Sequence, residues 1–321
     1  MPVKDTDILL VKPVPPLIVE ALDAAFTLHR LYDEDDPEGW LEANGGRVRG
    51  MVCGNFPLDA DLLDRLPALE IASNLGVGYD SVDVAAAKAR GVMVTHTRSV
   101  LDDEVADTAW ALVLMTVRGL ARADRYVRAG RWQSEGAFPL ARHSLKGSRL
   151  GIIGLGRIGR NIAARAEASG MEILYHGRHE QADQPYLYYG DLREMARDCD
   201  VLLNCAPGGP ATEKMIDAAV LEALGPEGYV INIGRGSSMD EAALIAALEA
   251  GTIAGAGLDV FEDEPEVPQA LRDMENTVLL PHIGSATIPT RTAMFQLVVD
   301  NLTGWFGRGE ALTPVPEMEG A

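Results

Sequence analysis

The segment Arg149-Leu-Gly-Ile-Ile-Gly-Leu-Gly-Arg-Ile-Gly159 constrains the fold of this chain more than any other. It sets three glycines in G-x-G-x-x-G spacing directly after a short apolar run and directly before the helical pattern of Arg160–Ser169. Such glycines let the chain turn sharply, let backbone N–H groups approach a pyrophosphate, and let a helix pack on a strand. The context predicts a strand-turn-helix unit that binds a dinucleotide, and a chance tight turn is the alternative.

The phosphates of a bound dinucleotide are expected at the N-terminus of that helix, where the partial positive charge favours anions. The residues assigned to this part of the site are Gly154, Leu155, Gly156, Arg157, Ile158 and Gly159.

Short apolar runs alternate with helical patterns on both sides of position 100, which predicts two α/β domains with parallel sheets. In the first hundred residues the expected strands are Ile8–Val11, Val48–Cys53, Leu69–Ser73 and Val92–Val94, and the expected helices are Leu58–Leu66 and Val82–Ala89. A second series then begins. Its six expected strands are Leu150–Ile153, Glu172–Tyr175, Val201–Cys205, Tyr229–Ile233, Ala254–Val260 and Val278–Leu280.

Three further helices are expected after position 100. The region from Asp103 to Ala129 reads as one long apolar helix that ends near Gly130, and it serves either a subunit interface or an interdomain strut. Asp240–Ala250 opens on an acid and is closed by Gly251. The helical pattern of Thr287–Phe306 is expected to return to the first domain, which would make that domain discontinuous.

The composition of the chain limits the classes of partner that it can bind. The 321 residues suit two domains, and 28 Lys+Arg against 48 Asp+Glu give a net charge of −20, which repels phosphate backbones and anionic lipids. An anionic substrate would then need locally placed cations. The three cysteines, Cys53, Cys199 and Cys205, form no C-x-x-C pair, and no apolar stretch reaches about 18 residues. We expect buried reduced thiols in a cytoplasmic, soluble protein without nucleic-acid, membrane or metal partners.

The segment after the second strand of the dinucleotide unit addresses cofactor preference. Where an NAD-specific unit carries an acid for the ribose 2′-OH, this chain reads His176-Gly177-Arg178-His179. Arg178 suits a 2′-phosphate, which a guanidinium binds bidentately. NADPH is therefore the expected cofactor, with NADH possible. The alternatives are a solvated Arg178 with Asp183 reaching the ribose, or a His176/His179 metal pair, which no Cys or third His accompanies.

Three chemically active residues follow three strands of the second domain. Arg235, Glu264 and His282 each come just after an apolar run, and parallel strands present their carboxyl ends to ligands at one edge of the sheet. Each alone reads as a surface, turn or packing residue. Together they match reduction of a 2-oxo acid, in which a cation holds and polarises the substrate and an acid protonates the carbonyl oxygen.

The combined motifs resemble the D-isomer-specific 2-hydroxyacid dehydrogenases, and within them the glyoxylate/hydroxypyruvate reductase and hydroxyphenylpyruvate reductase branch. The motifs are Asn74-Leu-Gly-Val-Gly-Tyr-Asp80, Val105-Ala-Asp107, the glycine turn, Ile231-Asn-Ile-Gly-Arg-Gly236, Gly257-Leu-Asp-Val-Phe261 through Glu264-Pro265, and Pro281-His-Ile-Gly284. The resemblance implies a Rossmann-type doubly wound domain at 101–286, which carries the dimerisation helix. This domain is inserted into a smaller flavodoxin-like substrate domain at 1–100 and 287–321, with the active site in the cleft between them and a homodimer built through the cofactor domains.

The resemblance also implies roles for single residues. Arg235 would bind and polarise the substrate, His282 would donate the proton, Glu264 would orient and charge His282, and the amides of Val77 and Gly78 would hold the substrate carboxylate. Asp259 would face the nicotinamide carboxamide. The cofactor contacts implied outside the glycine turn are Gly177, Arg178, His179, Pro207, Ile233, Arg235, Asp259, His282 and Gly284.

Two segments depart from that branch, and a third has two interpretations. Thr95-His-Thr-Arg98 replaces its usual threonine-proline turn and adds a His and an Arg, which bears on substrate choice. Gly177-Arg178-His179 replaces a Ser-Arg-Ser-like clamp, which bears on the degree of NADPH preference. Phe138-Pro139-Leu140 resembles a segment that reaches the partner subunit's active site, or it is a packed loop.

The sequence thus predicts an NADPH-dependent reductase that converts a small 2-oxo acid, such as glyoxylate or hydroxypyruvate, to the D-2-hydroxy acid. Two other functions stay open. One is an enzyme of the same fold acting on another small anion such as formate or phosphite, and the other is a nicotinamide-sensing binding protein without turnover.

Overall fold

The computed structural model describes residues 4–54 and 56–319. The chain divides into two compact units, of which the first is Met1–Leu101 with Thr287–Ala321 and the second is Asp102–Ala286. The second unit is thus one continuous segment between the two parts of the first. None of the helices in the described ranges has the length and apolar character needed to cross a membrane.

The first unit is built on a five-stranded parallel sheet in the order β2-β1-β3-β4-β5, which is the order of flavodoxin-like sheets. Its strands are β1 (Asp7–Leu10), β2 (Thr27–Arg30), β3 (Val48–Cys53), β4 (Ile71–Asn74) and β5 (Met93–Thr95). Its helices are α1 (Pro16–Ala25), α2 (Pro37–Asn44), α3 (Ala60–Arg65), α4 (Val84–Ala89) and α13 (Ile288–Arg308).

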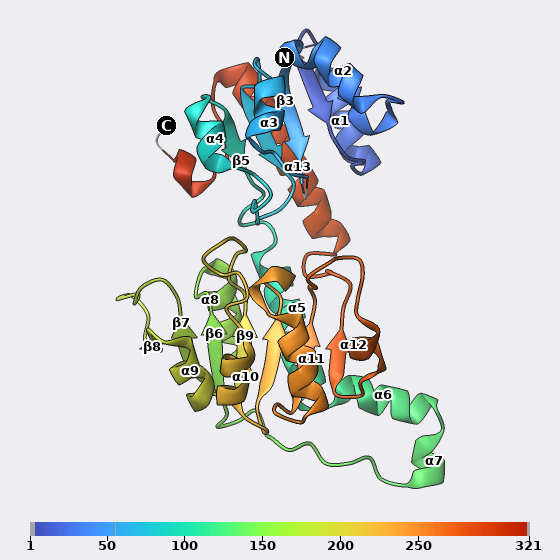
Figure 1. Cartoon of the computed structure of the whole chain (residues 1–321), viewed down its shortest axis with the longest axis vertical. Helices are drawn as coiled ribbons and strands as arrows, with labels where there is room; N and C mark the ends of the chain where they lie inside the picture. The colour runs from blue at the N-terminus through green and yellow to red at the C-terminus, as the bar shows by residue number, and fades with distance from the viewer. Residues whose placement is uncertain (1–3, 55, 320–321) are drawn as a thin grey trace. The chain divides into compact units, whose positions relative to one another are not determined.

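Helices cover both faces of this sheet. Ile8 and Leu10 of β1 pack in one core with α1 and α13, whereas Leu9 between them packs in a second core with α2, α3 and α4. The alternation follows from the two-residue period of a strand. The C-terminal helix α13 therefore belongs to the first unit, where Figure 1 shows it in red beside the blue N-terminal elements.

The second unit contains a seven-stranded parallel sheet in the order β12-β11-β10-β9-β6-β7-β8. Its strands are β6 (Arg149–Ile153), β7 (Glu172–His176), β8 (Leu187–Tyr189), β9 (Val201–Asn204), β10 (Tyr229–Asn232), β11 (Gly255–Leu258) and β12 (Thr277–Leu279). The strand order reverses between β6 and β9, and this is the switch point at which doubly wound sheets bind ligands. The predicted α/β fold with a Rossmann-type sheet inserted into a flavodoxin-like one is confirmed.

The helices of the second unit are α5 (Asp102–Val117), α6 (Leu120–Arg128), α7 (Arg131–Glu135), α8 (Arg157–Ala168), α9 (Leu192–Asp198), α10 (Ala218–Leu224), α11 (Glu241–Glu249) and α12 (Gln269–Asp273). They pack on both faces of its sheet, except α6 and α7, which extend away from it (Figure 1). Side chains of α9, α10 and α11 share one core with the sheet, and Figure 1 shows these helices side by side on one face. On α5, Thr116 lies so close to β11 that a Cβ on Gly257 would come within 2.6 Å of its Oγ1.

The predicted single helix from 103 to 129 is wrong. The structure has α5 and α6, separated at Gly119, whose φ of +62° is left-handed and interrupts the helix. The six strands predicted for the second unit are present, but a seventh, β8, was not predicted. In the first unit the strand β2 and the helices α1 and α2 were not predicted either.

Several acids of this acidic chain begin helices. Asp59, Asp83, Asp217 and Asp240 each accept a hydrogen bond from the backbone N–H three residues later. Such N-caps contribute about 1 kcal/mol each. The predicted start of α11 at Asp240 is confirmed, and Gly251, with φ +69°, follows its end. The remaining short helices are 3-10 turns at Leu31–Asp33, Gly45–Arg47, Gly236–Ser238 and Pro316–Met318.

Candidate active site

The glycine turn joins β6 to α8 at the carboxyl edge of the second sheet. Gly154 has a φ of +93°, and a Cβ there would lie 3.0 Å from the backbone of Ala206. A Cβ on Gly159 would lie 2.3 Å from the Gly154 carbonyl oxygen, so only glycine lets α8 approach the strand. A Cβ on Gly156 would meet no atom within 4 Å, so this side of the turn is open.

The N-terminus of α8 begins at Arg157, and no side chain caps it. The Nε of Arg157 lies 2.9 Å from Oδ2 of Asp102, the first residue of α5, and half of the arginine side chain is exposed. Open backbone, an uncapped helix N-terminus and an oriented arginine fit an anion such as a dinucleotide pyrophosphate. Leu155 is buried under the turn and Ile158 is half-buried.

The segment after β7 carries Arg178 and His179, and both side chains are exposed. Among the described residues Arg178 has no hydrogen bond or ion pair, so its guanidinium is available for an anion. Asp183, the alternative partner for a ribose, lies 3.3 Å from Arg160 of α8 and is thus paired with a cation. His176, which was considered as half of a metal pair, bonds through Nδ1 to the carbonyl oxygen of Tyr189 on β8.

Gln181, which the sequence gave no reason to single out, connects this segment to the glycine turn. Its Nε2 donates to the Leu155 carbonyl oxygen at 3.0 Å, and its Oε1 accepts from Arg160 at 2.7 Å. These contacts hold the loop that carries Arg178 beside the N-terminus of α8. Nothing in the local sequence pattern signals them, because they join residues more than twenty positions apart.

Arg235 follows β10 at the same carboxyl edge. Its carbonyl oxygen accepts from Asn232 Nδ2 at 2.9 Å and from Ser238 Oγ at 2.5 Å, which fixes its backbone. Its Nη1 donates to the Gly234 carbonyl oxygen at 2.8 Å. Ile233 beside it is nearly buried, and Pro207, after β9, is exposed.

Glu264 and His282 form the central pair of the site. His282 Nδ1 lies 2.7 Å from Glu264 Oε2, and the other carboxylate oxygen, Oε1, accepts from the Phe261 N–H at 3.1 Å. Burial acts to raise the pKa of Glu264, but the hydrogen bond and charge of His282 outweigh it, with help from the Phe261 N–H and Arg235. The pKa of Glu264 therefore lies below its usual value. With Nδ1 on Glu264, Nε2 is on the opposite edge of the ring.

Asp259, expected at the nicotinamide, is a buried anchor for the loop that carries His282. Its Oδ1 accepts from the Ile283 N–H at 2.8 Å and its Oδ2 from the Gly284 N–H at 2.9 Å. The His282 N–H in turn bonds to the Asp259 carbonyl oxygen at 2.9 Å. Burial raises the pKa of Asp259 against the effect of these two amides. His282 has a φ of +52°, so the loop holds it in a conformation that most residues avoid.

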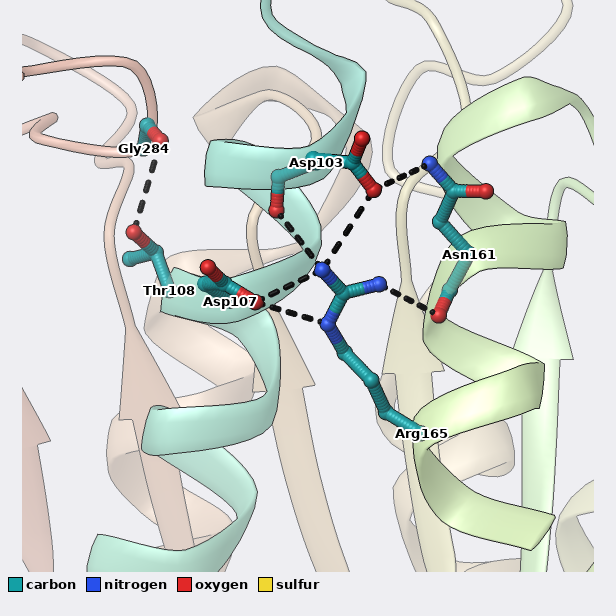
Figure 2. Close-up of polar contacts among 6 residues, drawn as sticks. All are labelled: Asp103, Asp107, Thr108, Asn161, Arg165 and Gly284. Atoms are coloured by element: carbon teal, nitrogen blue, oxygen red, sulfur yellow. Dashed lines mark hydrogen bonds and ion pairs between the residues drawn. The ribbon is translucent and has the colours of Figure 1, made fainter. Parts of the chain in front are cut away.

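Helix α5 contacts both the cofactor-side helix and the His282 loop. Figure 2 shows Arg165 of α8 bonded to Asp107 at 2.6 Å, with Asn161 bonded to Asp103 at 3.0 Å. Thr108 Oγ1 on the same helix donates to the Gly284 carbonyl oxygen at 3.3 Å. Asp107, noticed in the sequence only as part of a motif, is thus a link between α5 and α8.

Val77 and Gly78 lie in the first unit, in the loop after β4, and both are half-buried. Of the residues in the departing segment, Arg98 is paired with Glu319 at 2.5 Å, and the His96 ring bonds to the Val77 carbonyl oxygen. Phe138 packs edge-on against Tyr126 in the second unit, while Leu140 is 94% exposed.

Comparison with known proteins places these features in a family. Residues 110–284 match the D-isomer specific 2-hydroxyacid dehydrogenase, NAD binding domain. The chain is 44% identical over 309 residues to a hydroxyphenylpyruvate reductase of Plectranthus scutellarioides, covering 96% of this chain and 98% of the relative. It is 43% identical over 310 residues to glyoxylate/hydroxypyruvate reductase A of Arabidopsis thaliana, with the same coverage.

Solved structures agree with the sequence relatives. An NADPH-dependent glyoxylate/hydroxypyruvate reductase from Sinorhizobium meliloti, crystallised with NADP and malonate, superposes with a TM-score of 0.91 at 48% identity over 98% of each chain. A 2-hydroxyacid dehydrogenase from Ketogulonicigenium vulgare gives a TM-score of 0.90 at 43% identity over 97% of this chain and 98% of that one. With the glycine turn, the two sheets and these matches in agreement, the chain belongs to the D-isomer-specific 2-hydroxyacid dehydrogenase family.

Proposed function

We propose that the protein is an NADPH-dependent reductase that converts a small 2-oxo acid, of the glyoxylate or hydroxypyruvate type, to the D-2-hydroxy acid. The observation that carries the proposal is the contact of 2.7 Å between His282 and Glu264 at the carboxyl edge of a dinucleotide-type sheet. A histidine whose Nδ1 rests on a carboxylate can carry a proton on Nε2 and deliver it to a substrate oxygen.

The residues present fit a nicotinamide dinucleotide. The pyrophosphate would lie on the open side of Gly156 at the N-terminus of α8, and Arg178 would bind the 2′-phosphate that distinguishes NADPH from NADH. When bound, the nicotinamide supplies the hydride that reduces the carbonyl carbon. Pro207, Ile233, Asp259 and Gly284 come after four strands of this sheet, and they would line the nicotinamide.

The chain's own residues complete the reduction. The Arg235 guanidinium polarises the carbonyl and stabilises the negative charge that develops on its oxygen. His282 Nε2–H donates the proton to that oxygen, so the carbonyl gains a hydride at carbon and a proton at oxygen. Glu264 orients the ring through the contact with Nδ1. Val77 and Gly78 bind the substrate carboxylate through their backbone amides.

The proposal includes a homodimer formed through the second unit. Val127, Trp132 and Leu140, on α6, on α7 and in the segment after them, are all exposed apolar side chains. Large apolar side chains on one projecting segment are typical of an interface. It also includes a cytoplasmic location, because the three cysteines are free thiols and burial raises the pKa of each to about 12, which keeps them protonated and unreactive.

Initial rates of nicotinamide absorbance loss test the proposal. NADPH and NADH are each run against glyoxylate, hydroxypyruvate, pyruvate, hydroxyphenylpyruvate and 2-ketogluconate. We expect turnover with NADPH well above that with NADH, and highest values of kcat/KM for glyoxylate or hydroxypyruvate. Binding of both cofactors without turnover of any of the five acids would overturn it in favour of a sensor. A preference for hydroxyphenylpyruvate or 2-ketogluconate would correct the substrate while keeping the reaction.

A further inference from the structure

The loop after β4 has every carbonyl oxygen of three consecutive residues hydrogen-bonded within the first unit. The Gly76 oxygen accepts from the Thr97 N–H at 2.9 Å and from Asn74 Nδ2 at 3.2 Å. The Val77 oxygen lies 3.0 Å from His96 Nδ1, and the Gly78 oxygen accepts from Asn74 Nδ2 at 2.8 Å. Donors from β4 and from the segment after β5 therefore hold one side of this loop.

Holding the carbonyls fixes where the amides point. These peptide bonds are trans, and in a planar trans peptide the C=O of one residue and the N–H of the next point in opposite directions. The N–H groups of Val77 and Gly78 therefore point away from the donors that hold the Gly76 and Val77 oxygens. Among the described residues neither amide donates a hydrogen bond. Two adjacent N–H groups directed to one side form a concavity that suits an anion.

His96 provides the bond that decides the orientation of the Val77–Gly78 peptide. A carbonyl oxygen can only accept, so His96 Nδ1 must carry a proton and donate it. His96 is 4% exposed, and its ring meets the Tyr79 ring edge-on at 5.4 Å. The backbone of His96 is also held, because its N–H donates to the Thr313 carbonyl oxygen and its own carbonyl oxygen accepts from Thr313 Oγ1.

Without that bond the Val77–Gly78 peptide can rotate. Such a rotation changes ψ of Val77 and φ of Gly78, and a glycine adopts positive and negative φ at similar cost. The rotated peptide would present the Val77 oxygen where the Gly78 N–H had been. An acceptor in place of a donor repels a carboxylate.

We propose that His96 is a positioning residue that locks the Val77–Gly78 peptide, with its amides directed toward the substrate carboxylate, and thereby sets the affinity for the 2-oxo acid. The inference rests on the proposed function, and it assigns a role to a histidine that the sequence marked only as a departure from its branch. Asn74 shares the task, because its single amide group bonds to the carbonyl oxygens on both sides of Val77.

The test compares His96→Leu with His96→Asn. In asparagine, Nδ2 is bonded to Cγ as Nδ1 is in histidine, so it can donate to the Val77 oxygen from the same place, whereas leucine fills the space without a donor. We expect His96→Leu to raise KM for glyoxylate or hydroxypyruvate at least tenfold with kcat within about threefold of the wild type. His96→Asn should restore KM to within about threefold. The dissociation constant of NADPH, measured by fluorescence, should be unchanged in both.

A matched control is His29→Leu. His29 is also in the first unit, on β2 at the opposite edge of the sheet, and is paired with Asp7. Loss of this histidine should leave KM unchanged even if the melting temperature falls. Two results would overturn the inference. One is an equal rise in KM for His96→Leu and His96→Asn. The other is a rise in KM for His29→Leu as large as that for His96→Leu, which would show a general effect of destabilisation.

Oxalate binding by calorimetry separates this inference from the proposed function. If the wild type turns over no 2-oxo acid, the proposed function fails, and the role of His96 is judged by oxalate alone. Binding by the wild type and by His96→Asn, with at least tenfold weaker binding by His96→Leu, supports the inference. Equal binding by all three, or none by the wild type, overturns it. If His96→Leu does not fold, His96→Gln replaces it, because its amide lies one bond further from the backbone.

Discussion

Arg235 has two proposed roles, which are to bind the substrate and to stabilise the negative charge that develops on the substrate's carbonyl oxygen. Its backbone is fixed by Asn232 and Ser238, so replacing its side chain should leave the loop in place. We expect Arg235→Ala to lower kcat and raise KM together, with kcat/KM falling by about 10²–10⁴. Arg193→Ala, at an exposed arginine of α9, is the control and should change neither constant. Normal activity in Arg235→Ala would remove the catalytic assignment.

The role of Glu264 should appear in the pH dependence of the free energy of unfolding. Its pKa is lowered in the folded protein, so its carboxylate stabilises the fold at pH values above the ordinary glutamate pKa of about 4.3. That stabilisation is lost as the pH falls through the lower, folded pKa. Urea unfolding of the wild type and Glu264→Gln should therefore differ at pH 7 and converge once the pH has fallen below the folded pKa of Glu264. We also expect Glu264→Gln to lower kcat about 10–100-fold at pH 7. A stability difference that is independent of pH would contradict the ion pair.

Arg178 should decide between the two nicotinamide cofactors. A charged hydrogen bond to a phosphate contributes about 1.5–3 kcal/mol, which is roughly a 10–100-fold change in binding. Arg178→Ala should raise the KM of NADPH by that factor and leave the KM of NADH nearly unchanged. Fluorescence titration makes the same comparison without turnover, because 2′,5′-ADP carries the 2′-phosphate of NADPH and 5′-AMP lacks it. Arg178→Ala should weaken the binding of 2′,5′-ADP and leave that of 5′-AMP nearly unchanged. Equal weakening of both nucleotides would mean that Arg178 does not contact the 2′-phosphate.

At the scale of elements, strands that bury apolar side chains were predictable, including the edge strands β5 and β12, whereas the exposed edge strands β2 and β8 were not. β3 was predicted over its whole length, and the ends of β6, β7 and β9 fall within one residue of the expected ones. Each is a continuous apolar run between two layers of helices, which is the pattern of a buried parallel strand. The edge strands β2 and β8 bury less, so no apolar run marks them. α2 was missed because it buries only Leu41.

In the candidate site, too, some features could be predicted from the sequence and others could not. Arg235, Glu264 and His282 could be predicted because each follows a strand, and parallel strands end at one edge. The contacts that hold the glycine turn, the Arg178 loop and the Val77 loop could not be predicted. Asp102 with Arg157, Gln181 with Leu155, and His96 with Val77 join positions that no local period connects.

The break between α5 and α6 makes a prediction at this scale. A Cβ on Gly119 would meet no atom closer than 3.8 Å, so the penalty for a side chain there comes from the positive φ alone. Gly119→Ala should lower the free energy of unfolding by about 1–2 kcal/mol. Gly307 lies within α13 with open space around its Cβ position, and Gly307→Ala should be stabilising by up to about 1 kcal/mol. A stabilising Gly119→Ala would mean that α5 and α6 join into one helix.

At the scale of the whole molecule, the proposed dimer predicts a mass of twice the chain mass of 34.4 kDa in light scattering. Leu140 is 94% exposed in the single chain, and burying a leucine contributes about 1.5–3 kcal/mol. A homodimer contains two copies of Leu140, so Leu140→Glu should raise the dimer dissociation constant by roughly 10²–10⁴-fold. Leu187→Glu is the control, since Leu187 is an exposed leucine on the edge strand β8. A monomeric wild type would contradict the dimer without affecting the chemistry.

The stereochemistry of the product tests the central claim most directly. Purified protein is incubated with NADPH and hydroxypyruvate, and the glycerate formed is resolved by chiral chromatography. Delivery of hydride to one face of a carbonyl held by Arg235 and His282 should give D-glycerate alone, in amounts equal to the NADPH consumed. L-Glycerate, a racemic mixture, or NADPH loss without glycerate would contradict the account.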